Sequence, residues 1–275
     1  QQKEKFLPKL TNGTFIGGQA LTEPNHGSDV FGMKTTATKC KGGYLLNGHK
    51  WLVGLAPIAD VAVVYASTNP QLGRWGISAF LVEKDREGYT ATKALDKMGL
   101  RTIPTGELIF ENCFVPFENL LGNEGSGFGI INYSMEYDRC TIFSSQLGAM
   151  ERQLEQTIQY TQSRNQFGQP IGKFQAVSNR IADMKLRLET AKLLLYKTAW
   201  LMNQGKSTIL DSSLLKLYLS ESFVDSRYDA VRVHGGVGYL TNHGVERNLR
   251  DAIGGVIYAG TSDIQRNIIA QYLGI

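Results

Sequence analysis

Cysteine is scarce in this chain, and the few cysteines present do not form a framework. Cys40, Cys113 and Cys140 are odd in number and lack metal-ligand spacing. The pattern argues against a disulfide scaffold, and we expect no metal site. Reduced thiols are typical of a reducing compartment, which predicts a cytoplasmic protein.

Long apolar runs and clustered charge of one sign are also missing. No run approaches the ~18 apolar residues of a membrane span, and the opening residues carry no secretory signal. The net charge of +4 is small, and basic residues alternate with acidic ones. We therefore expect neither membrane insertion nor a nucleic-acid partner.

Apolar residues make up 42% of the 275 positions, enough for a sizeable core and two domains of an α+β protein. From residue 13 to 124 the apolar runs are short, rich in β-branched or aromatic residues, and separated by turn residues. This spacing predicts an antiparallel barrel or sandwich. The expected strands include Tyr44–Leu46, Val61–Tyr65, Ile77–Val82 and Glu107–Phe110.

The pattern changes at the glycines of residues 122–127. Beyond them apolar residues recur every three or four positions, which predicts a long helix ending near Arg164. Further helices are expected over about 174–203, about 210–234 and after Gly260. The segment 125–275 is therefore predicted to be an up-down four-helix bundle.

A polar motif, Tyr258–Arg266, opens the last of these helices. Gly260 allows a sharp turn, and Thr261 or Ser262 can cap the following amides. Free N–H groups at a helix start bind anions, so this loop could hold a cofactor. A capped surface helix with no ligand is the alternative.

Together with other motifs, this segment resembles the acyl-CoA dehydrogenase family of flavoproteins. Those motifs are Leu21–Asp29 (LTEPNHGSD), Asn47–Lys50 (NGHK), Met98–Arg101 (MGLR), Phe110–Asn112 (FEN), Arg164–Gly168 (RNQFG) and His234–Tyr239 (HGGVGY). The resemblance covers nearly the whole chain. It implies FAD as the cofactor, a homodimer or homotetramer, and an electron-transfer flavoprotein or oxygen as electron acceptor.

Most of the family has a further helical domain, on the order of a hundred residues long, before the β domain. Residues 1–12 resemble the last link from that domain, with a helix end interrupted at Pro8 and a turn at Asn12-Gly13. Either the chain is part of a longer protein, or a partner supplies this layer.

The resemblance also implies which residues contact FAD, and four of them depart from the family pattern. Leu52 replaces an aromatic residue, Gly54 a hydroxyl residue, Arg232 a Gln, and Asp263 a Gln or Glu. The implied FAD residues are Gln19, Leu21, Thr22, Gly27, Ser28, Leu52, Gly54, Arg164, Gln166, Phe167, Arg232, Gly235, Gly236, Thr261 and Asp263.

The family removes an α-proton from an acyl thioester with a carboxylate, which most members place just before the Gly-Thr of the C-terminal loop. That position is Ala259 here. A minority, typified by isovaleryl-CoA dehydrogenase, place a Glu before an Arg on the first long helix. The matching residues are Asp138 and Arg139, so Asp138 is the predicted base. By resemblance, the backbone N–H of Ala259 polarises the thioester carbonyl.

Two alternatives concern this carboxylate. Asp138 could instead form an ion pair with Arg139 or with another helix. Glu136 is a rival base, but two residues along a helix turn about 200°, so the two side chains cannot serve one pocket.

Three functions remain open at this level. The first is FAD-dependent α,β-desaturation of an acyl thioester carried on CoA or on a carrier protein, where the group is acyl or aminoacyl. The departures at Leu52, Arg232 and Asp138 favour the carrier-bound form. The second is a flavin-dependent amine oxygenase on the same fold. The third is a catalytically weak subunit of a hetero-oligomer.

Overall fold

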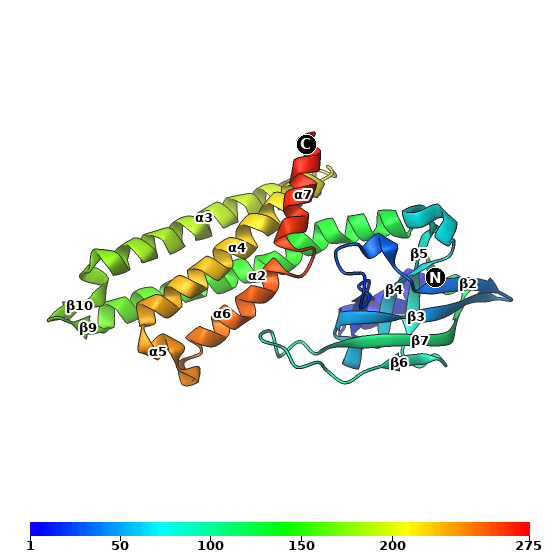
Figure 1. Ribbon diagram of the computed structural model, residues 1–275, viewed down its shortest axis with the longest axis horizontal. Coiled ribbons are helices and arrows are strands. Elements are labelled where there is room, and N and C mark those ends of the chain that lie inside the picture. Colours follow the sequence, from blue (N-terminus) through cyan, green and yellow to red (C-terminus); the bar gives the residue numbers. More distant parts are fainter. The chain divides into compact units, whose positions relative to one another are not determined.

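The computed structural model describes residues 1–275, which divide into two compact units (Figure 1). The first, here called the sheet unit, comprises Gln1–Lys97 and Arg101–Asn132. The second, the helical unit, comprises Met98–Leu100 and Tyr133–Ile275.

The sheet unit holds one eight-stranded sheet. Its strands follow the order β6-β7-β3-β2-β4-β5-β8, and β1 pairs with β4 beside this path. The strands are β1 (Gly17–Ala20), β2 (Thr36–Cys40), β3 (Gly43–Gly54), β4 (Val61–Ser67), β5 (Ile77–Glu83), β6 (Tyr89–Ala91), β7 (Thr105–Pro116) and β8 (Leu120–Leu121). Short 3-10 turns lie between them: η1 (Val30–Gly32), η2 (Ala56–Ile58), η3 (Pro70–Gly76) and η4 (Phe117–Asn119).

The sheet is mixed and open, which differs from the expected antiparallel barrel. Strand β4 pairs in parallel with β1 along Gly17–Ala20 and with β2 at one position, whereas the other pairings are antiparallel. The outer strands β6 and β8 do not pair with each other. The α+β class and all four expected strands are confirmed.

The core of this unit follows from strand β4, whose residues are buried on both faces except at one position. A strand covered on both sides is apolar along its whole length, as the run from Val61 to Ala66 is. The buried side chains of this core include Val64 on β4 itself and Leu46, Phe80, Leu108, Phe110 and Val115 on other strands.

Helix α1 spans Gln2–Thr11 and contains Pro8. The expected interruption at Pro8 is wrong. A proline removes one N–H bond to the residue four positions back, and here the helix continues through Thr11, whose hydroxyl donates to the Leu7 carbonyl at 2.8 Å. Gly13 follows with a φ of 76°, as its turn requires.

The helical unit is built around α4 (Ile209–His234), which packs against α3 (Gln175–Asn203), α6 (Val245–Ile253) and α7 (Ser262–Tyr272). Helices α2 (Gly127–Ser163), α3 and α4 run alongside one another (Figure 1). Their shared core includes Phe143, Leu147, Met184, Leu188, Leu215 and Leu219. The other elements are β9 (Asn165–Gln166), β10 (Gln169–Pro170), η5 (Ile171–Lys173), α5 (Gly236–Tyr239), η6 (Thr241–His243) and η7 (Gly254–Val256).

The four predicted helices are thus confirmed, and α6 is an addition that we did not expect. Its nine residues are mostly polar, and only Val245 and Ala252 are buried. None of the helices in the chain combines the length and hydropathy needed to cross a lipid bilayer.

Candidate active site

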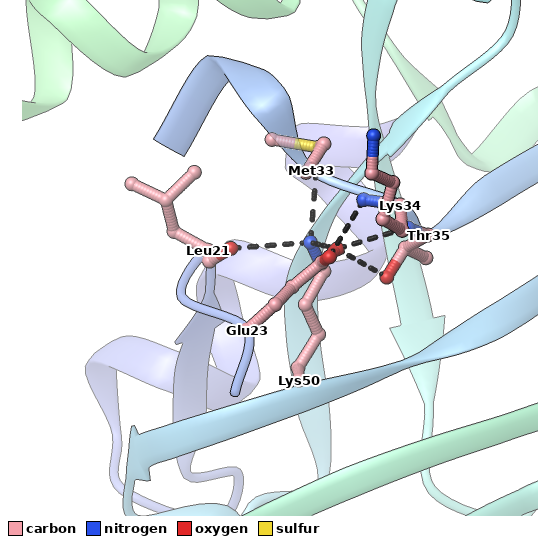
Figure 2. Close-up of polar contacts among 6 residues, drawn as sticks. All are labelled: Leu21, Glu23, Met33, Lys34, Thr35 and Lys50. Carbon is pink, nitrogen blue, oxygen red and sulfur yellow. Dashed lines mark hydrogen bonds and ion pairs between the residues drawn. The ribbon is translucent and has the colours of Figure 1, made fainter. Parts of the chain in front are cut away.

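A loop of the sheet unit, here called the 21–35 loop, joins β1 to β2 and contains the LTEPNHGSD motif. Its organising side chain is Glu23, which is 5% exposed. The Glu23 carboxylate accepts hydrogen bonds from Lys34 N at 2.6 Å, Thr35 N at 2.9 Å and Thr35 Oγ1 at 2.6 Å (Figure 2). One carboxylate therefore connects the two ends of the loop.

Lys50 on β3 completes this cluster and is fully buried. Its ammonium donates to Glu23 Oε1 at 2.9 Å and to the Leu21 carbonyl at 3.1 Å, and it lies 3.7 Å from Met33 Sδ (Figure 2). Burial lowers the pKa of Lys50 to about 8, against the opposing attraction of Glu23. Burial alone would raise the pKa of Glu23, but Lys50 and the hydrogen bonds lower it to about 2. The pair is therefore ionised at neutral pH.

The sheet unit holds its predicted FAD residues on β1, on β3 and on the 21–35 loop. Trp51 N donates to the Thr22 carbonyl at 2.8 Å, so Leu21 and Thr22 lie beside β3. A Cβ on Gly27 or on Gly54 would meet no protein atom within 4 Å. Ser28 is exposed, while Gln19 on β1 donates to the Tyr65 hydroxyl at 3.2 Å.

A β-bulge changes the geometry at Leu52. The register between β3 and β7 shifts between Lys50 and Val53, and Leu52 has a φ of 55°. Bulges redirect side chains, so counting by strict alternation does not hold across Trp51 and Leu52. The Leu52 side chain is 49% exposed, as expected of a residue that meets a ligand or a partner rather than the core.

In the helical unit the Ala259 loop is held by two side chains. Arg139 Nε donates to the Ala259 carbonyl at 3.3 Å, and Gln265 Nε2 donates to the same oxygen at 3.3 Å and to the Gly260 carbonyl at 3.0 Å. Ala259 has a φ of 55°, a conformation that alanine adopts only when its surroundings enforce it. Its N–H has no acceptor within the protein.

Asp138 precedes Arg139 on α2 and is half-buried without a hydrogen bond or an ion pair. Burial raises the pKa of Asp138, and the neighbouring Arg139 guanidinium opposes the rise. The alternative ion pair does not form, because Arg139 donates to Ala259 and to Ser213 Oγ instead.

The rival carboxylate, Glu136, has a structural partner. Its Oε2 accepts from Thr208 N at 2.6 Å and from Thr208 Oγ1 at 2.7 Å. Since Thr208 is the N-cap residue of α4, Glu136 holds the start of that helix.

The predicted FAD residues of the helical unit lie at its turns and at the ends of its helices. A cavity of about 640 Å³ brings Arg164 together with His234, directly before Gly235. His234 stacks on Tyr160 with ring centroids 4.2 Å apart, and burial lowers its pKa. This cavity connects two motifs that are about seventy residues apart in the chain.

The remaining predicted FAD residues of the helical unit have few contacts within the chain. Phe167, on the turn between β9 and β10, is 94% exposed with a φ of 51°. A Cβ on Gly235 or Gly236 would meet no atom within 4 Å. Gln166 is exposed, Arg232 lies over the Tyr228 ring, Thr261 caps α7 by accepting from Ile264 N, and Asp263 is exposed.

Sequence reasoning gave no role to Lys50, Glu23 and Gln265, although each fixes a loop that it singled out. Charged and amide residues in a polar motif normally face solvent, so nothing in the pattern indicates that these are buried. The one available signal was that Glu23 and Lys50 both occur within recognisable motifs.

Comparison with known proteins identifies the class. The family model described as the acyl-CoA dehydrogenase middle domain matches residues 18–113, and that of the C-terminal domain matches residues 125–274. The chain belongs to the acyl-CoA dehydrogenase family of FAD-dependent oxidoreductases, as the motifs predicted.

Two individual proteins are similar to this chain over nearly its whole length. An L-prolyl-peptidyl-carrier-protein dehydrogenase of Pseudomonas fluorescens is 49% identical over 274 residues, which are 99% of this chain and 72% of the relative. The isovaleryl-CoA dehydrogenase of Arabidopsis thaliana is 40% identical over 272 residues, covering 99% of this chain and 66% of the relative.

Solved structures agree with these relatives. The prolyl acyl carrier protein oxidase AnaB has a TM-score of 0.98 at 48% identity, covering 100% of this chain and 72% of AnaB. The structure described as PigA with FAD and proline has a TM-score of 0.97 at 42% identity, covering 99% of this chain and 71% of PigA.

The residues present fit FAD. The sheet unit presents open glycines and the exposed Leu52, where a planar ring can approach the backbone. The helical unit presents Arg164 and Arg232, neither of which forms an ion pair, and guanidinium groups suit a pyrophosphate.

Proposed function

We propose that this protein oxidises an aminoacyl group, L-prolyl in the first instance, held as a thioester on a carrier protein. The substrate is inferred from relatives that cover nearly the whole chain at 49% and 42% identity and are both L-prolyl-peptidyl-carrier-protein dehydrogenases. The isovaleryl-CoA enzyme is 40% identical, so a CoA thioester is the alternative that the experiment has to exclude.

The main support for the proposed reaction is the environment of Asp138. It is a half-buried carboxylate with no hydrogen bond or ion pair, and burial raises its pKa. A carboxylate that forms no hydrogen bond or ion pair, and whose pKa is raised, is suited to accept a proton from carbon. We assign Asp138 as the base that takes the α-proton of the thioester.

Arg139 and Ala259 are assigned to stabilising the thioester oxygen. As the α-proton leaves, negative charge develops on the thioester oxygen, and a fixed N–H donor stabilises it. The Ala259 N–H is free, and the adjoining peptide unit, which carries the Ala259 carbonyl, is held by Arg139 and Gln265. Arg139 therefore acts by positioning Ala259, because its guanidinium donates to the Ala259 carbonyl.

Bound FAD supplies the two-electron acceptor for the hydrogen on the β-carbon. In the sheet unit, Gln19, Leu21, Thr22, Gly27, Leu52 and Gly54 are assigned to the ring end and Ser28 to the pyrophosphate. In the helical unit, the nucleotide end of an FAD shared with a second copy of the chain is assigned to Arg164, Gln166, Phe167, Arg232, Gly235, Gly236, Thr261 and Asp263. One carbon-carbon double bond forms, and the proton stays on Asp138 until it is released to solvent.

Two partners are proposed, a second copy of the chain and an electron acceptor. Phe167 is 94% exposed on a tight turn, as expected of a side chain that meets a second copy of the chain, so we propose a homo-oligomer with a shared flavin site. The electron acceptor is proposed to be an electron-transfer flavoprotein or oxygen. A solved structure described as an electron transferring flavoprotein of Acidaminococcus fermentans has a TM-score of 0.96 at 39% identity, covering 99% of this chain and 72% of that one.

The test uses the purified flavoprotein without oxygen. L-Prolyl-loaded carrier protein is expected to bleach the flavin absorbance, and intact-mass analysis of the carrier should show the loss of two hydrogens per double bond. L-Prolyl-CoA and isovaleryl-CoA are the matched comparisons. Faster bleaching by either CoA thioester would overturn the carrier assignment, and no bleaching by any thioester would overturn the dehydrogenase reaction. Admitting air, or adding an electron-transfer flavoprotein, then identifies the acceptor by which one restores the colour.

A further inference from the structure

The Glu23–Lys50 ion pair is an unusual feature of the sheet unit because both side chains are buried, at 5% and 0% exposure. Removing two charges from water costs more than their attraction commonly returns, so a buried pair is a poor device for stability alone. Neither residue is part of the proposed chemistry. The pair therefore needs a different explanation.

The contacts of the pair end on the backbone of the 21–35 loop. Lys50 holds the Leu21 carbonyl at the start of the loop, and Glu23 holds the N–H groups of Lys34 and Thr35 at its end. Figure 2 shows all these contacts converging on the two charged groups. Leu21 is thereby fixed from β3, the strand that also fixes Thr22 through Trp51 N.

An ammonium group suits this position because it has three donors in a compact space. Lys50 directs them at Leu21 O, Glu23 Oε1 and Met33 Sδ. The Glu23 carboxylate neutralises the charge and still accepts three further hydrogen bonds. A neighbouring glycine maintains the packing, since a Cβ on Gly48 would collide with the Thr35 side chain.

We propose that Lys50, with Glu23 as its counter-ion, is a positioning pair that sets the Leu21–Thr22 backbone for the flavin ring before FAD binds. The inference rests on the proposed function only in that FAD binds at this loop. Both side chains are buried against the loop, so neither is exposed to a ligand. Loss of the pair changes how the ring is held even where the fold survives.

The experiment compares single variants with a charge-free double variant. Lys50→Met leaves a buried carboxylate, so the thermal midpoint of the apoprotein falls. The double variant Glu23→Gln/Lys50→Met removes both charges, so we expect that midpoint to recover in part, because an amide accepts through one oxygen where the carboxylate accepts through two. The Leu21 carbonyl nevertheless loses its donor, and the Kd for FAD should stay raised by on the order of tenfold or more. The flavin spectrum should move toward that of free FAD, and the reduction potential should shift.

A matched control lies in the same unit. Lys84 and Asp60 form an ion pair at 2.7 Å. Asp60 Oδ2 also accepts a hydrogen bond at 2.8 Å from the N–H of Ile16, the residue directly before β1. Asp60→Asn/Lys84→Met removes a pair that also fixes a loop, but not the 21–35 loop. Its Kd for FAD and its flavin spectrum should match wild type.

The outcomes separate this inference from the proposed function. A double variant with wild-type Kd, spectrum and potential would show that the pair serves the fold alone. If the double variant does not fold, Glu23→Gln decides: an unchanged Kd and spectrum overturn the proposal, and a Kd raised several-fold supports it. A wild-type protein that binds FAD without oxidising prolyl-carrier thioester refutes the substrate and leaves the positioning pair standing. A wild-type protein that binds no FAD refutes both.

Discussion

Arg139 on α2 donates its Nε–H to the carbonyl oxygen of Ala259, 3.3 Å away and 120 residues further along the chain. The contact holds a non-glycine residue at a φ of 55°, where the Ala259 N–H is free to donate. Backbone strain of this kind persists only where neighbouring groups enforce it, and it occurs often at active sites.

Replacing Arg139 by Gln should lower turnover by roughly tenfold to a hundredfold, because displacing a fixed donor by ~1 Å has effects of that size. The rate of anaerobic flavin bleaching measures the change, with FAD affinity unaltered. Ser213→Ala is the matched control, because it removes one hydrogen bond to Arg139 and leaves the bond to Ala259. Equal losses in both variants would contradict the positioning role.

Asp138→Asn should abolish bleaching by thioester while leaving FAD bound. A missing general base reduces rates by about a hundredfold or more. Thermal stability should hold or rise, because the substitution removes a half-buried carboxylate that has no partner. Asp225→Asn, at an exposed position on α4, serves as the control. Bleaching at the wild-type rate in Asp138→Asn would end the assignment of this base.

Glu136→Ala should reduce stability and spare the chemistry. The variant strips both hydrogen bonds from Thr208 at the start of α4, which costs about 1 to 3 kcal/mol for bonds to a charged group. Urea unfolding measures the loss, and the bleaching rate per bound flavin should match wild type. Glu136→Gln, which can still accept one bond, should fall between the two proteins. Loss of bleaching with stability intact would instead mark Glu136 as the base.

Acid should destabilise the fold partly through Glu23. Its pKa is lowered from 4.5 to about 2 in the folded protein, where burial is outweighed by Lys50 and three hydrogen bonds. Between these two pH values the unfolded chain binds more protons, so the free energy of unfolding falls as pH drops, by at most about 1.4 kcal/mol per pH unit for one group.

Urea unfolding of wild type and Glu23→Gln from pH 5 to pH 3 isolates this contribution. The difference between the two free energies of unfolding should shrink as the pH falls. Glu83 and Asp60 also have lowered pKa values, but they are present in both proteins and cancel in the difference. A difference that stays constant across this range would contradict the ionised pair.

Gly54→Ser should be tolerated by the fold and should strengthen FAD binding. A Cβ there meets nothing within 4 Å, and by resemblance the position matches a hydroxyl residue of the acyl-CoA dehydrogenase family. The thermal midpoint of the apoprotein should stay near that of wild type, and the Kd for FAD should fall. Gly48→Ser is the contrasting variant, since a Cβ at that position collides with Thr35. An unchanged Kd in Gly54→Ser would contradict the assignment of the flavin to this end of β3.

Much of the helical unit could be predicted because its apolar spacing is long and regular. The ends expected near residues 164, 174, 203, 210 and 234 lie within about two residues of those of α2, α3 and α4. Helix α6 was missed although Val245, Leu249, Ala252 and Ile253 recur at helical spacing, because nine residues are too short for that spacing to repeat. Pro8 misled because a proline signals an interruption whether or not the helix continues past it.

The sheet unit was less predictable for physical reasons. Parallel pairing joins β1 to β4 across about forty residues, and no local pattern encodes a contact at that distance. The bulge at Trp51 and Leu52 changes which way side chains face, so counting from a motif fails there. Lys50 in a polar strand segment resembles a solvated residue, and only its partner in three dimensions shows that it is buried.

The parallel pairing of β1 with β4 also has a consequence for the newly made chain. Strand β1 emerges first but has no partner until Val61–Val64 has been synthesised, and the 21–35 loop gains its anchor only when Lys50 has been placed on β3. Contacts between distant segments form slowly. We therefore expect this loop to mature after the local β2–β3 pair has formed, so that the ability to retain flavin is acquired after that pair.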